Sequence, residues 1–544
     1  MAGIRLQKTQ TFLVVLLLAA AVPYVVNLGV SSIWDANEAF YAQTPREMME
    51  AGDYVTPSFN FQLRMNKPVL SYWNVALSYH LFGISEWSER LPIALGALVI
   101  IATAYSLAHL LAGTTAGLLA ALVLATSPRL LLLARRIIID IHITMWMGLV
   151  LLFFALSETR VERRRLYLSL MYVAAGFGVL TKGPVAVFLP AVAFFIYLAS
   201  QKRLGDLRHM MLPAGAAISL AIAAPWYYLL YREYGWTYIS AFIFGENLGR
   251  YAEAVGEQSR GVLFYLPVAL ADLFPWSALI PVAIWWAARA QLQARIARLL
   301  IIWISTVVVF FSLSGTKEDL YILPIVAAEA AVIGAMLAAA RQGSSAARST
   351  AVAIGVTAVL LVVAGSGLLW AFAASGRYVL SGATSVGAMA VLGGVVAGGM
   401  AIRGRVLTAV AAVASALVVI AWCIVLCTLP DFERYKPVRP FAEIIRSRAS
   451  AGAIVGSYRF ALPSMVFYLH RPVMEVLLPD HLRSVFHSSA DVYFVMPEAE
   501  YKTVRDHLPT KTYVLGRREM FDVKAKNFLD GSELSRFVLI SNRE

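Results

Sequence analysis

The stretch "TFLVVLLLAAAVPYVVNLG", residues 11–29, decides the fold class because it is long, continuous and uncharged. A run of about 19 apolar residues is enough for an α-helix to cross a bilayer. Such runs recur along the chain, in which 59% of the 544 residues are hydrophobic and 15% are charged. A soluble domain has roughly 45–50% apolar and about 25% charged residues. The sequence therefore predicts a polytopic α-helical membrane protein and excludes a soluble multidomain protein.

We expect about 13 transmembrane helices, counted from the apolar runs. The first run could be a signal peptide, but we interpret it as a retained anchor, because it is long and no small-x-small cleavage site precedes the charged segment that follows. The other predicted spans are residues 89–111, 115–133, 140–157, 167–181, 184–200, 211–231, 262–287, 299–313, 320–340, 350–375, 384–402 and 406–429.

Basic residues in alternate connections indicate the orientation. The segments "ETRVERRRL" (158–166), "QKRLGDLRH" (201–209) and "ARAQLQARIAR" (288–298) all fall on the side of the N-terminus. Short basic connections face the cytoplasm, so we predict a cytoplasmic N-terminus and, with an odd number of spans, a periplasmic C-terminus. This bias also explains the net charge of +13 better than nucleic-acid binding does.

The C-terminal part differs in composition from the rest, so we expect two domains: a membrane domain, 1–430, and a soluble periplasmic α/β domain, 431–544. In the latter, "GAIVGSYRF" and "DVYFVMP" are typical of buried strands. The segments "PVRPFAEIIRSRA" and "PEAEYKTVRDHL" are typical of amphipathic helices.

Ionisable side chains concentrate in the predicted outer connections. The first of these, an outer loop at 31–88, contains Asp35, Glu38, Arg64 and Lys67, and Asp140 begins a span after "RRIII". Cations at a membrane surface suit a lipid phosphate, and carboxylates nearby suit general-base catalysis. These residues predict group transfer from a lipid phosphate on the outer face. Further outer cations and polar groups are Lys182, Arg250, Arg260, Lys317 and Tyr321.

No cofactor is expected from the motifs. Cys423 and Cys427 are four apart in an apolar run, a spacing that cannot close a normal disulfide on a helix. The sequence contains no HExxH, no paired CxxC and no glycine-rich nucleotide loop. A metal site therefore has no support from the sequence, and neither does a nucleotide site.

Several motifs resemble the GT-C membrane glycosyltransferases that use polyprenyl-phosphate sugars, in particular the bacterial aminoarabinose lipid A transferases and the protein O-mannosyltransferase superfamily. They occur in the same order along nearly the whole chain. The motifs are "NEAFYAQTPREMMEAGDYVTPSFNFQLRMNKPVLSYW", "RRIIIDIHITMW", "LTKGPVAVFLP", "APWYYLLY", "FPWSALIP", "KEDLYILP" and "PSMVFYLHRPV".

The resemblance implies roles for individual residues. Lys67, Arg250 and Tyr321 fall where the family binds the donor phosphate, and we group Tyr41, from the first motif, with them. Asp140 matches the second outer-loop acid.

Two positions depart from the family pattern. Glu38 matches the Glu of the family's "DE" pair, but Asn37 replaces its Asp, so the catalytic acid could be Asp35 or Glu38. These two are three apart, and one helical turn would place both on a shared face. Asn66 stands where aminoarabinose transferases have a Glu that forms a metal site in some relatives, so we predict no metal ligands.

The leading hypothesis is a glycosyltransferase of the inner membrane. It would move a sugar from a polyprenyl-phosphate donor to a lipid A-type glycolipid, another envelope glycan or a protein. A transporter or flippase of lipid-linked sugars is the alternative, and it predicts paired repeats that the sequence does not show. A structural membrane subunit is a third possibility, but it gives no reason for acids and cations to gather on one face.

Overall fold

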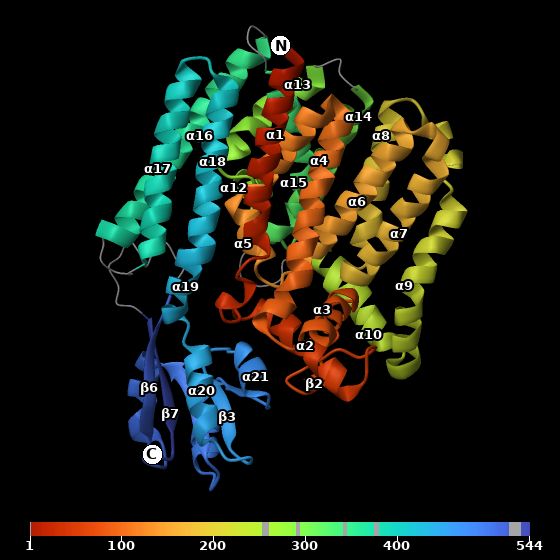
Figure 1. Ribbon diagram of the computed structural model, residues 1–544. Coiled ribbons are helices and arrows are strands. Elements are labelled where there is room, and N and C mark those ends of the chain that lie inside the picture. Colours follow the sequence, from red (N-terminus) through yellow and green to blue (C-terminus); the bar gives the residue numbers. More distant parts are fainter. Residues whose placement is uncertain (1, 253–259, 290–293, 341–344, 375–379, 522–534) are drawn as a thin grey trace.

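The apolar runs form a helical bundle that carries a small mixed sheet beyond one end (Figure 1). The structure, a computed structural model, describes residues 2–252, 260–289, 294–340, 345–374, 380–521 and 535–544. The first helix, α1 (Ala2–Ala21), starts at the opposite end of the bundle from the sheet. We call these two ends of the bundle the α1 end and the sheet end.

Every predicted apolar run overlaps helix in the described chain. Nine helices there are long and apolar enough to span a membrane, or ten if a bent pair counts as one span. The bundle helices after α1 are α4 (Glu86–Ala125), α5 (Pro128–Ala134), α6 (Ile139–Thr159), α7 (Arg164–Lys182), α8 (Val185–Ser200), α9 (Leu212–Tyr234), α12 (Tyr265–Asp272), α13 (Ile280–Arg289), α14 (Ala294–Leu313), α15 (Val326–Ala339), α16 (Ser345–Leu369), α17 (Ser381–Ile402) and α18 (Val406–Cys423).

Two predicted spans, 89–111 and 115–133, share the element α4. The backbone leaves helical geometry at Ala112 and at Gly113, whose φ of +83° suits a residue without a Cβ. A Cβ on Gly117 would lie 2.9 Å from the ring of Tyr105. Along a straight helix these two positions would be about 18 Å apart, at roughly 1.5 Å per residue. The two halves of α4 therefore run back against each other, as two spans.

The predicted span 262–287 is not one straight helix. Its two parts, Val262–Asp272 and Trp276–Arg289, meet at an angle of 112°. Pro275 lies in the break; proline cannot donate a backbone hydrogen bond and disfavours helical geometry at the residue before it. The expectation of a regular span here is therefore corrected to a bent pair.

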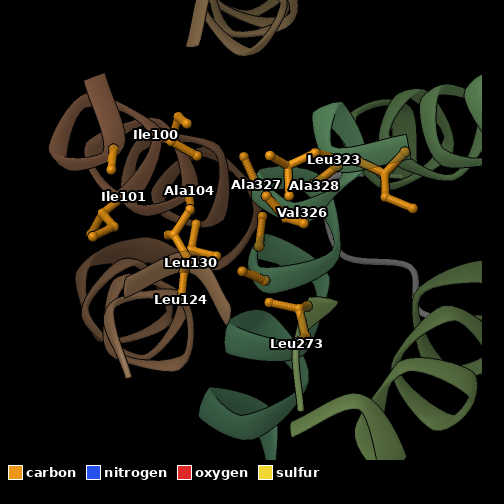
Figure 2. Packing of buried hydrophobic residues seen from close by; sticks show 14 of the residues in the cluster. Ile100, Ile101, Ala104, Leu124, Leu130, Leu273, Leu323, Val326, Ala327 and Ala328 are labelled. Carbon is orange, nitrogen blue, oxygen red and sulfur yellow. The ribbon is translucent and has the colours of Figure 1, made fainter. Parts of the chain in front are cut away.

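The centre of the bundle is α15, an alanine-rich helix in a span that is 89% buried. Side chains of α4 and α5 pack with those of α15 in this part of the core (Figure 2). A Cβ on Gly334 would lie 2.5 Å from the carbonyl oxygen of Ala116, so α15 and α4 approach at backbone distance. Small residues allow such close packing, which stabilises helix pairs in a membrane.

The first outer connection is structured rather than a loop. It folds at the sheet end into α2 (Asn37–Ala51), the hairpin of β1 (Ser58–Phe59) and β2 (Gln62–Leu63), and α3 (Leu70–Phe82). Pro45 lies inside α2, and Gly52 ends that helix with φ +67°. The outer connection therefore forms a fixed layer over the bundle.

The C-terminal region is a five-stranded sheet in the order β4–β3–β5–β7–β6. β3 pairs in parallel with β4 and β5, whereas β7 is antiparallel to β5 and β6. The predicted strands and helices around 437–508 are all present. The elements are α20 (Val438–Arg448), β3 (Ile454–Tyr458), α21 (Ser464–Leu469), β4 (Met474–Val476), α22 (Pro479–Phe486), β5 (Val492–Pro497), α23 (Glu498–Val504), β6 (Tyr513–Met520) and β7 (Ser535–Ser541).

Candidate functional site

A mainly apolar cavity of about 380 Å³ opens among α6, α8, α14 and the segment before α15. Its polar groups include Lys67, Lys182, Glu246 and Tyr321. Its apolar walls include Phe188, Met147 and Phe310. An apolar chamber with cations among its polar groups can hold a lipid chain together with its phosphate.

Lys67 reaches this cavity from the end of the first outer connection, where Pro68 leads into α3. Its Nζ forms an ion pair of 3.1 Å with Glu246 Oε2, and both side chains are about one-quarter exposed, at 23% and 27%. A phosphate bound by Lys67 would have to share or displace this carboxylate. Lys67, which the resemblance implies for the donor phosphate, therefore lines this cavity beside a carboxylate.

Asp140 and Lys182 form an ion pair at the sheet end of α6 and α7. Lys182 also lies 4.8 Å from the ring centroid of Tyr321, which lines the same cavity. α7 ends at Lys182 because Gly183 follows with φ +87°. The ion pair joins a predicted catalytic acid to this cavity, and Lys182 is the second lysine in the cavity lining.

Tyr41 and Arg64 lie close to these groups. Burial raises the pKa of the Tyr41 phenol well above its usual value; Tyr72 and Asp140 raise it further, and Arg64 opposes them. The Arg64 guanidinium lies 3.7 Å from the ring centroid of Phe40. The structure thus brings Tyr41 within electrostatic range of Asp140 and Arg64, as a shared site requires.

Two other predicted donor-binding residues are placed differently. The buried Lys317 donates a hydrogen bond of 2.6 Å from Nζ to the carbonyl oxygen of Ser314, so it holds a turn beside the cavity. Arg250 begins α11 (Arg250–Ala252), directly before Tyr251, which lines the cavity. The Arg250 side chain lies outside the described part of the chain, so its role stays a prediction.

Glu38 is not among the residues that line the cavity beside Lys67 and Lys182. Its carboxylate forms two hydrogen bonds with Arg90, of 2.9 and 3.1 Å, and accepts two more from the backbone N–H groups of Trp34 and Ile137. Burial alone would raise the pKa of Glu38, but the Arg90 guanidinium lowers it below its ordinary value. This carboxylate is 2% exposed and fully hydrogen-bonded, which is the geometry of a structural ion pair.

Asp35 binds the C-terminal region instead of a neighbouring acid. Its two carboxylate oxygens accept hydrogen bonds of 2.6 Å from the backbone N–H and the hydroxyl of Ser464, the first residue of α21. Burial raises the pKa of Asp35 to about 6. Because α2 begins only at Asn37, the expected helical face shared by Asp35 and Glu38 does not form.

Sequence reasoning missed Arg90, Glu246 and Lys436. Lys436 follows the last span and donates from Nζ to Ser31 and Ser32. Burial lowers its pKa to about 7. Arg90 lies inside a predicted apolar run, and an arginine in such a run is itself a signal that a buried acid must lie nearby. Nothing in the local pattern indicates which acid that is.

The bundle, its outer helical layer and the cation-lined lipid-type cavity together define the GT-C class of membrane glycosyltransferase folds, and the predicted resemblance to that class is confirmed. The particular relatives are aminoarabinose transferases. The chain resembles ArnT from Cupriavidus metallidurans, solved bound to undecaprenyl phosphate, with a TM-score of 0.80, 25% identity and coverage of 98% of each chain. It also shares its fold with the Archaeoglobus fulgidus oligosaccharyltransferase, at a TM-score of 0.51, 14% identity and coverage of 91% of this chain and 71% of that one.

Sequence comparisons agree with the structural ones. Residues 66–229 match the family model described as dolichyl-phosphate-mannose-protein mannosyltransferase. Undecaprenyl phosphate-alpha-4-amino-4-deoxy-L-arabinose arabinosyl transferase 2 from Pseudomonas fluorescens is 31% identical over 59% of this chain. The corresponding transferase from Pectobacterium carotovorum is 30% identical, also over 59%. The matched part spans 55% and 58% of the length of these two curated relatives.

Proposed function

We propose that this protein is an inner-membrane glycosyltransferase that takes a sugar from a polyprenyl-phosphate donor. The observation that carries the proposal is the apolar cavity with Lys67 and Lys182 among its lining residues. The apolar walls suit a prenyl chain, and the two ammonium groups suit the phosphate that joins chain and sugar. The relatives named for undecaprenyl-phosphate aminoarabinose transfer, and the solved ArnT bound to undecaprenyl phosphate, support the same donor class.

In the proposed reaction an acceptor oxygen attacks the anomeric carbon of the sugar. The bond from that carbon to the phosphate oxygen breaks, and polyprenyl phosphate leaves with the bonding electrons. Lys67 and Lys182 stabilise the charge that develops on the phosphate. Asp140, ion-paired with Lys182, takes the proton of an acceptor hydroxyl. If the acceptor is itself an ionised phosphate, no proton is transferred, and Asp140 orients the sugar.

The assignment of catalytic acids follows from what each carboxylate contacts. Asp140 is paired with a lysine that lines the donor cavity, and its side chain keeps 13% exposure. We therefore propose Asp140 as the catalytic acid. Glu38 and Asp35 are positioning residues, because Arg90 and Ser464 occupy their oxygens.

We further propose an acceptor in the outer leaflet of the inner membrane. A lipid A-type glycolipid fits the aminoarabinose relatives; another envelope glycan or a protein would fit the same chemistry. Asn37 and Asn66 differ from the aminoarabinose pattern, so the sugar itself must be identified by experiment. Mass spectrometry of envelope glycolipids and glycoproteins from a deletion strain, with and without the plasmid-borne gene, would identify the missing sugar and its acceptor.

Donor binding can be tested on the purified full-length protein. Lys67→Ala should weaken undecaprenyl-phosphate binding about tenfold, as the loss of one charge-assisted contact implies. Lys502→Ala, an exposed lysine of α23, is the matched control and should bind like the wild type. Equal affinity of Lys67→Ala and wild type at the same salt concentration would refute this role of the cavity.

The chemical step is tested separately. Asp140→Asn should retain donor binding and lose transfer by about 10²-fold or more, as expected for a general acid–base residue. Asp480→Asn, on the exposed surface of α22, should remain fully active. A flippase would move the lipid-linked sugar across a vesicle membrane without forming a product of new mass, so product formation separates the two functions.

A further inference from the structure

A second cavity, of about 200 Å³, lies at the sheet end and is separate from the donor cavity. It opens between the segment after α1, the end of α5 and the segment after α18. Three arginines line it, Arg90, Arg135 and Arg136, together with Trp34, Leu132 and Phe432. Among the described residues that line it there is no acid.

Two of these arginines are already bound within the protein. Arg90 forms its ion pair with Glu38. Arg135 is 5% exposed and donates three hydrogen bonds of 2.6–2.7 Å to the carbonyl oxygens of Pro23, Val26 and Asn27. Its Nε is buried without a hydrogen-bond partner in the described chain. Arg135 therefore fixes the end of the first span and leaves one buried donor unused.

Arg136 differs from both. Its side chain makes neither a hydrogen bond nor an ion pair with any described residue, and its Nε is also buried without a partner. Its contact is with Trp34, whose ring centroid lies 4.7 Å from the guanidinium carbon. Such a cation–π contact contributes about 0.5–2 kcal/mol and leaves the planar donors of the guanidinium available. A partly buried guanidinium whose donors have no described partner is suited to bind an anion from outside the chain.

The surroundings show what kind of molecule carries that anion. The wall residue Leu132 is 40% exposed, and Phe432 stacks on Trp34 with ring centroids 5.2 Å apart. This apolar wall is formed by residues at the ends of spans, close to the start of the C-terminal region. A small anion in water would gain nothing from it, whereas the glycerol and first acyl carbons of a lipid would bury apolar area.

We propose that this cavity binds the phosphate of an outer-leaflet lipid, with Arg136 as its main ligand and the Trp34–Phe432 pair against the adjoining apolar part. The nearby carboxylates are bound elsewhere in the described chain: Glu38 pairs with Arg90, and Glu433 Oε2 lies 4.0 Å from Lys436 Nζ and accepts from the backbone N–H of Ser32. The other oxygen of Glu433 is buried without a partner among the described residues and forms no ion pair with Arg136. The site is distinct from the donor cavity and does not depend on the proposed sugar transfer.

The position of the site suggests what it is for. Arg136 lies on the short connection between α5 and α6, and Asp140, in the first turn of α6, is paired with Lys182 of the donor cavity. A lipid held through Arg136 would therefore lie one short connection from the group that we propose for acid–base catalysis. A phosphorylated acceptor lipid and an ordinary anionic phospholipid share this chemistry, and competition between them would show which one binds more tightly.

The test measures lipid binding by native mass spectrometry of the full-length protein in a neutral detergent. Phosphatidylglycerol is the probe, diacylglycerol with the same acyl chains is the phosphate-free control, and inorganic phosphate tests for a free anion. We expect Arg136→Gln to weaken phosphatidylglycerol binding about tenfold. Arg459→Gln, an arginine that is 46% exposed in the C-terminal region, should leave binding unchanged.

Three outcomes would overturn the proposal. Equal binding by Arg136→Gln and wild type would remove Arg136 as the ligand. Equal losses in Arg136→Gln and Lys67→Ala would place the lipid in the donor cavity. Displacement by millimolar inorganic phosphate would indicate a free-anion site. If Arg136→Gln lowers the thermal midpoint of unfolding, Arg136→Lys is tested in its place. This variant keeps the charge but loses the planar pair of donors. It should bind phosphatidylglycerol a few-fold more weakly than wild type.

Discussion

At the scale of single residues, burial and partners separate acids that the sequence presents alike. Asp35, Glu38 and Asp140 are all carboxylates near predicted outer ends of spans. Glu38 is enclosed by Arg90, Asp35 binds Ser464, and only Asp140 is joined to the donor cavity. The chemistry that a carboxylate can perform thus depends on which of its oxygens remain accessible, which residue type and spacing do not reveal.

We predict that Glu38→Gln destabilises the protein by about 3 kcal/mol, because it removes the carboxylate that pairs with the buried Arg90 and leaves it with three backbone carbonyls and the longer Glu89 contact of 3.5 Å. Thermal unfolding in detergent measures this effect. The control is Glu500→Gln, which removes an exposed ion pair with Arg459 and should change stability by less than about 1 kcal/mol. A Glu38→Gln protein of normal stability and without transfer activity would instead make Glu38 catalytic.

The pH dependence of stability should reveal Lys436. Burial lowers the folded-state pKa of Lys436 from 10.5 to about 7. Glu433 and Glu38 oppose this shift by raising the pKa, whereas Arg90 and Arg136 lower it further. A depressed folded pKa contributes stability that is present above the unfolded value and is lost as the pH falls through about 7.

Replacing Lys436 by Met tests this dependence. Relative to Lys436→Met, the wild type should lose stability steadily as the pH is lowered from about 10 to 7. Thermal midpoints measured at half-unit intervals would show it, with Lys502→Met as the exposed-lysine control. Parallel pH profiles for wild type and Lys436→Met would show that the lysine is not buried in the folded protein.

At the scale of elements, the outer layer and the C-terminal region are bound together by specific polar contacts. Asp35 binds both the backbone and the hydroxyl of Ser464, and Asn60 exchanges two hydrogen bonds of 2.9 Å with the backbone of Val473. Tyr468 accepts from the backbone of Ile33. The C-terminal region thus fixes the first outer connection, which in turn carries Lys67 to the cavity.

We therefore expect Asp35→Asn to loosen this contact while leaving donor binding intact. The loss of two charge-assisted hydrogen bonds should cost about 1–3 kcal/mol. Limited proteolysis and hydrogen exchange of residues 431–521 would report the loosening, with Asp480→Asn as the control. Unchanged protection combined with lost transfer would contradict the positioning role and return Asp35 to the group of reacting residues.

The elements themselves could be predicted from the sequence far better than the contacts between them. Apolar runs and the strand around Val455 are local sequence patterns. A turn after Lys182 is indicated by the glycine that follows it. The Glu38–Arg90 pair joins residues 52 apart, and Asp35 and Ser464 are 429 apart. Such partners are determined by tertiary packing, which leaves no periodic signal in the sequence. The elements could therefore be predicted, whereas the partners in the buried ion pairs could not.

At the scale of the whole molecule, the proposed chemistry requires one compartment. Lys67, Asp140 and the C-terminal region all lie at the sheet end, and the start of α1 lies at the other end. Two cavities at the sheet end, one with lysines and one with Arg136, would hold two phosphate-bearing lipids on the same side of the membrane. This arrangement is productive only if donor and acceptor are both on the side of the membrane to which the sheet end belongs.

We predict accordingly that residue 162 is cytoplasmic and residue 480 periplasmic. Residue 162 lies in the basic connection between α6 and α7, and short basic connections stay in the cytoplasm. Fusions at residue 162 should therefore be active with a cytoplasmic reporter, and fusions at residue 480 with a periplasmic one. Reporter pairs that are active only on opposite sides of the membrane provide the internal control. A cytoplasmic residue 480 would place both cavities on the inner side and would rule out transfer on the outer face.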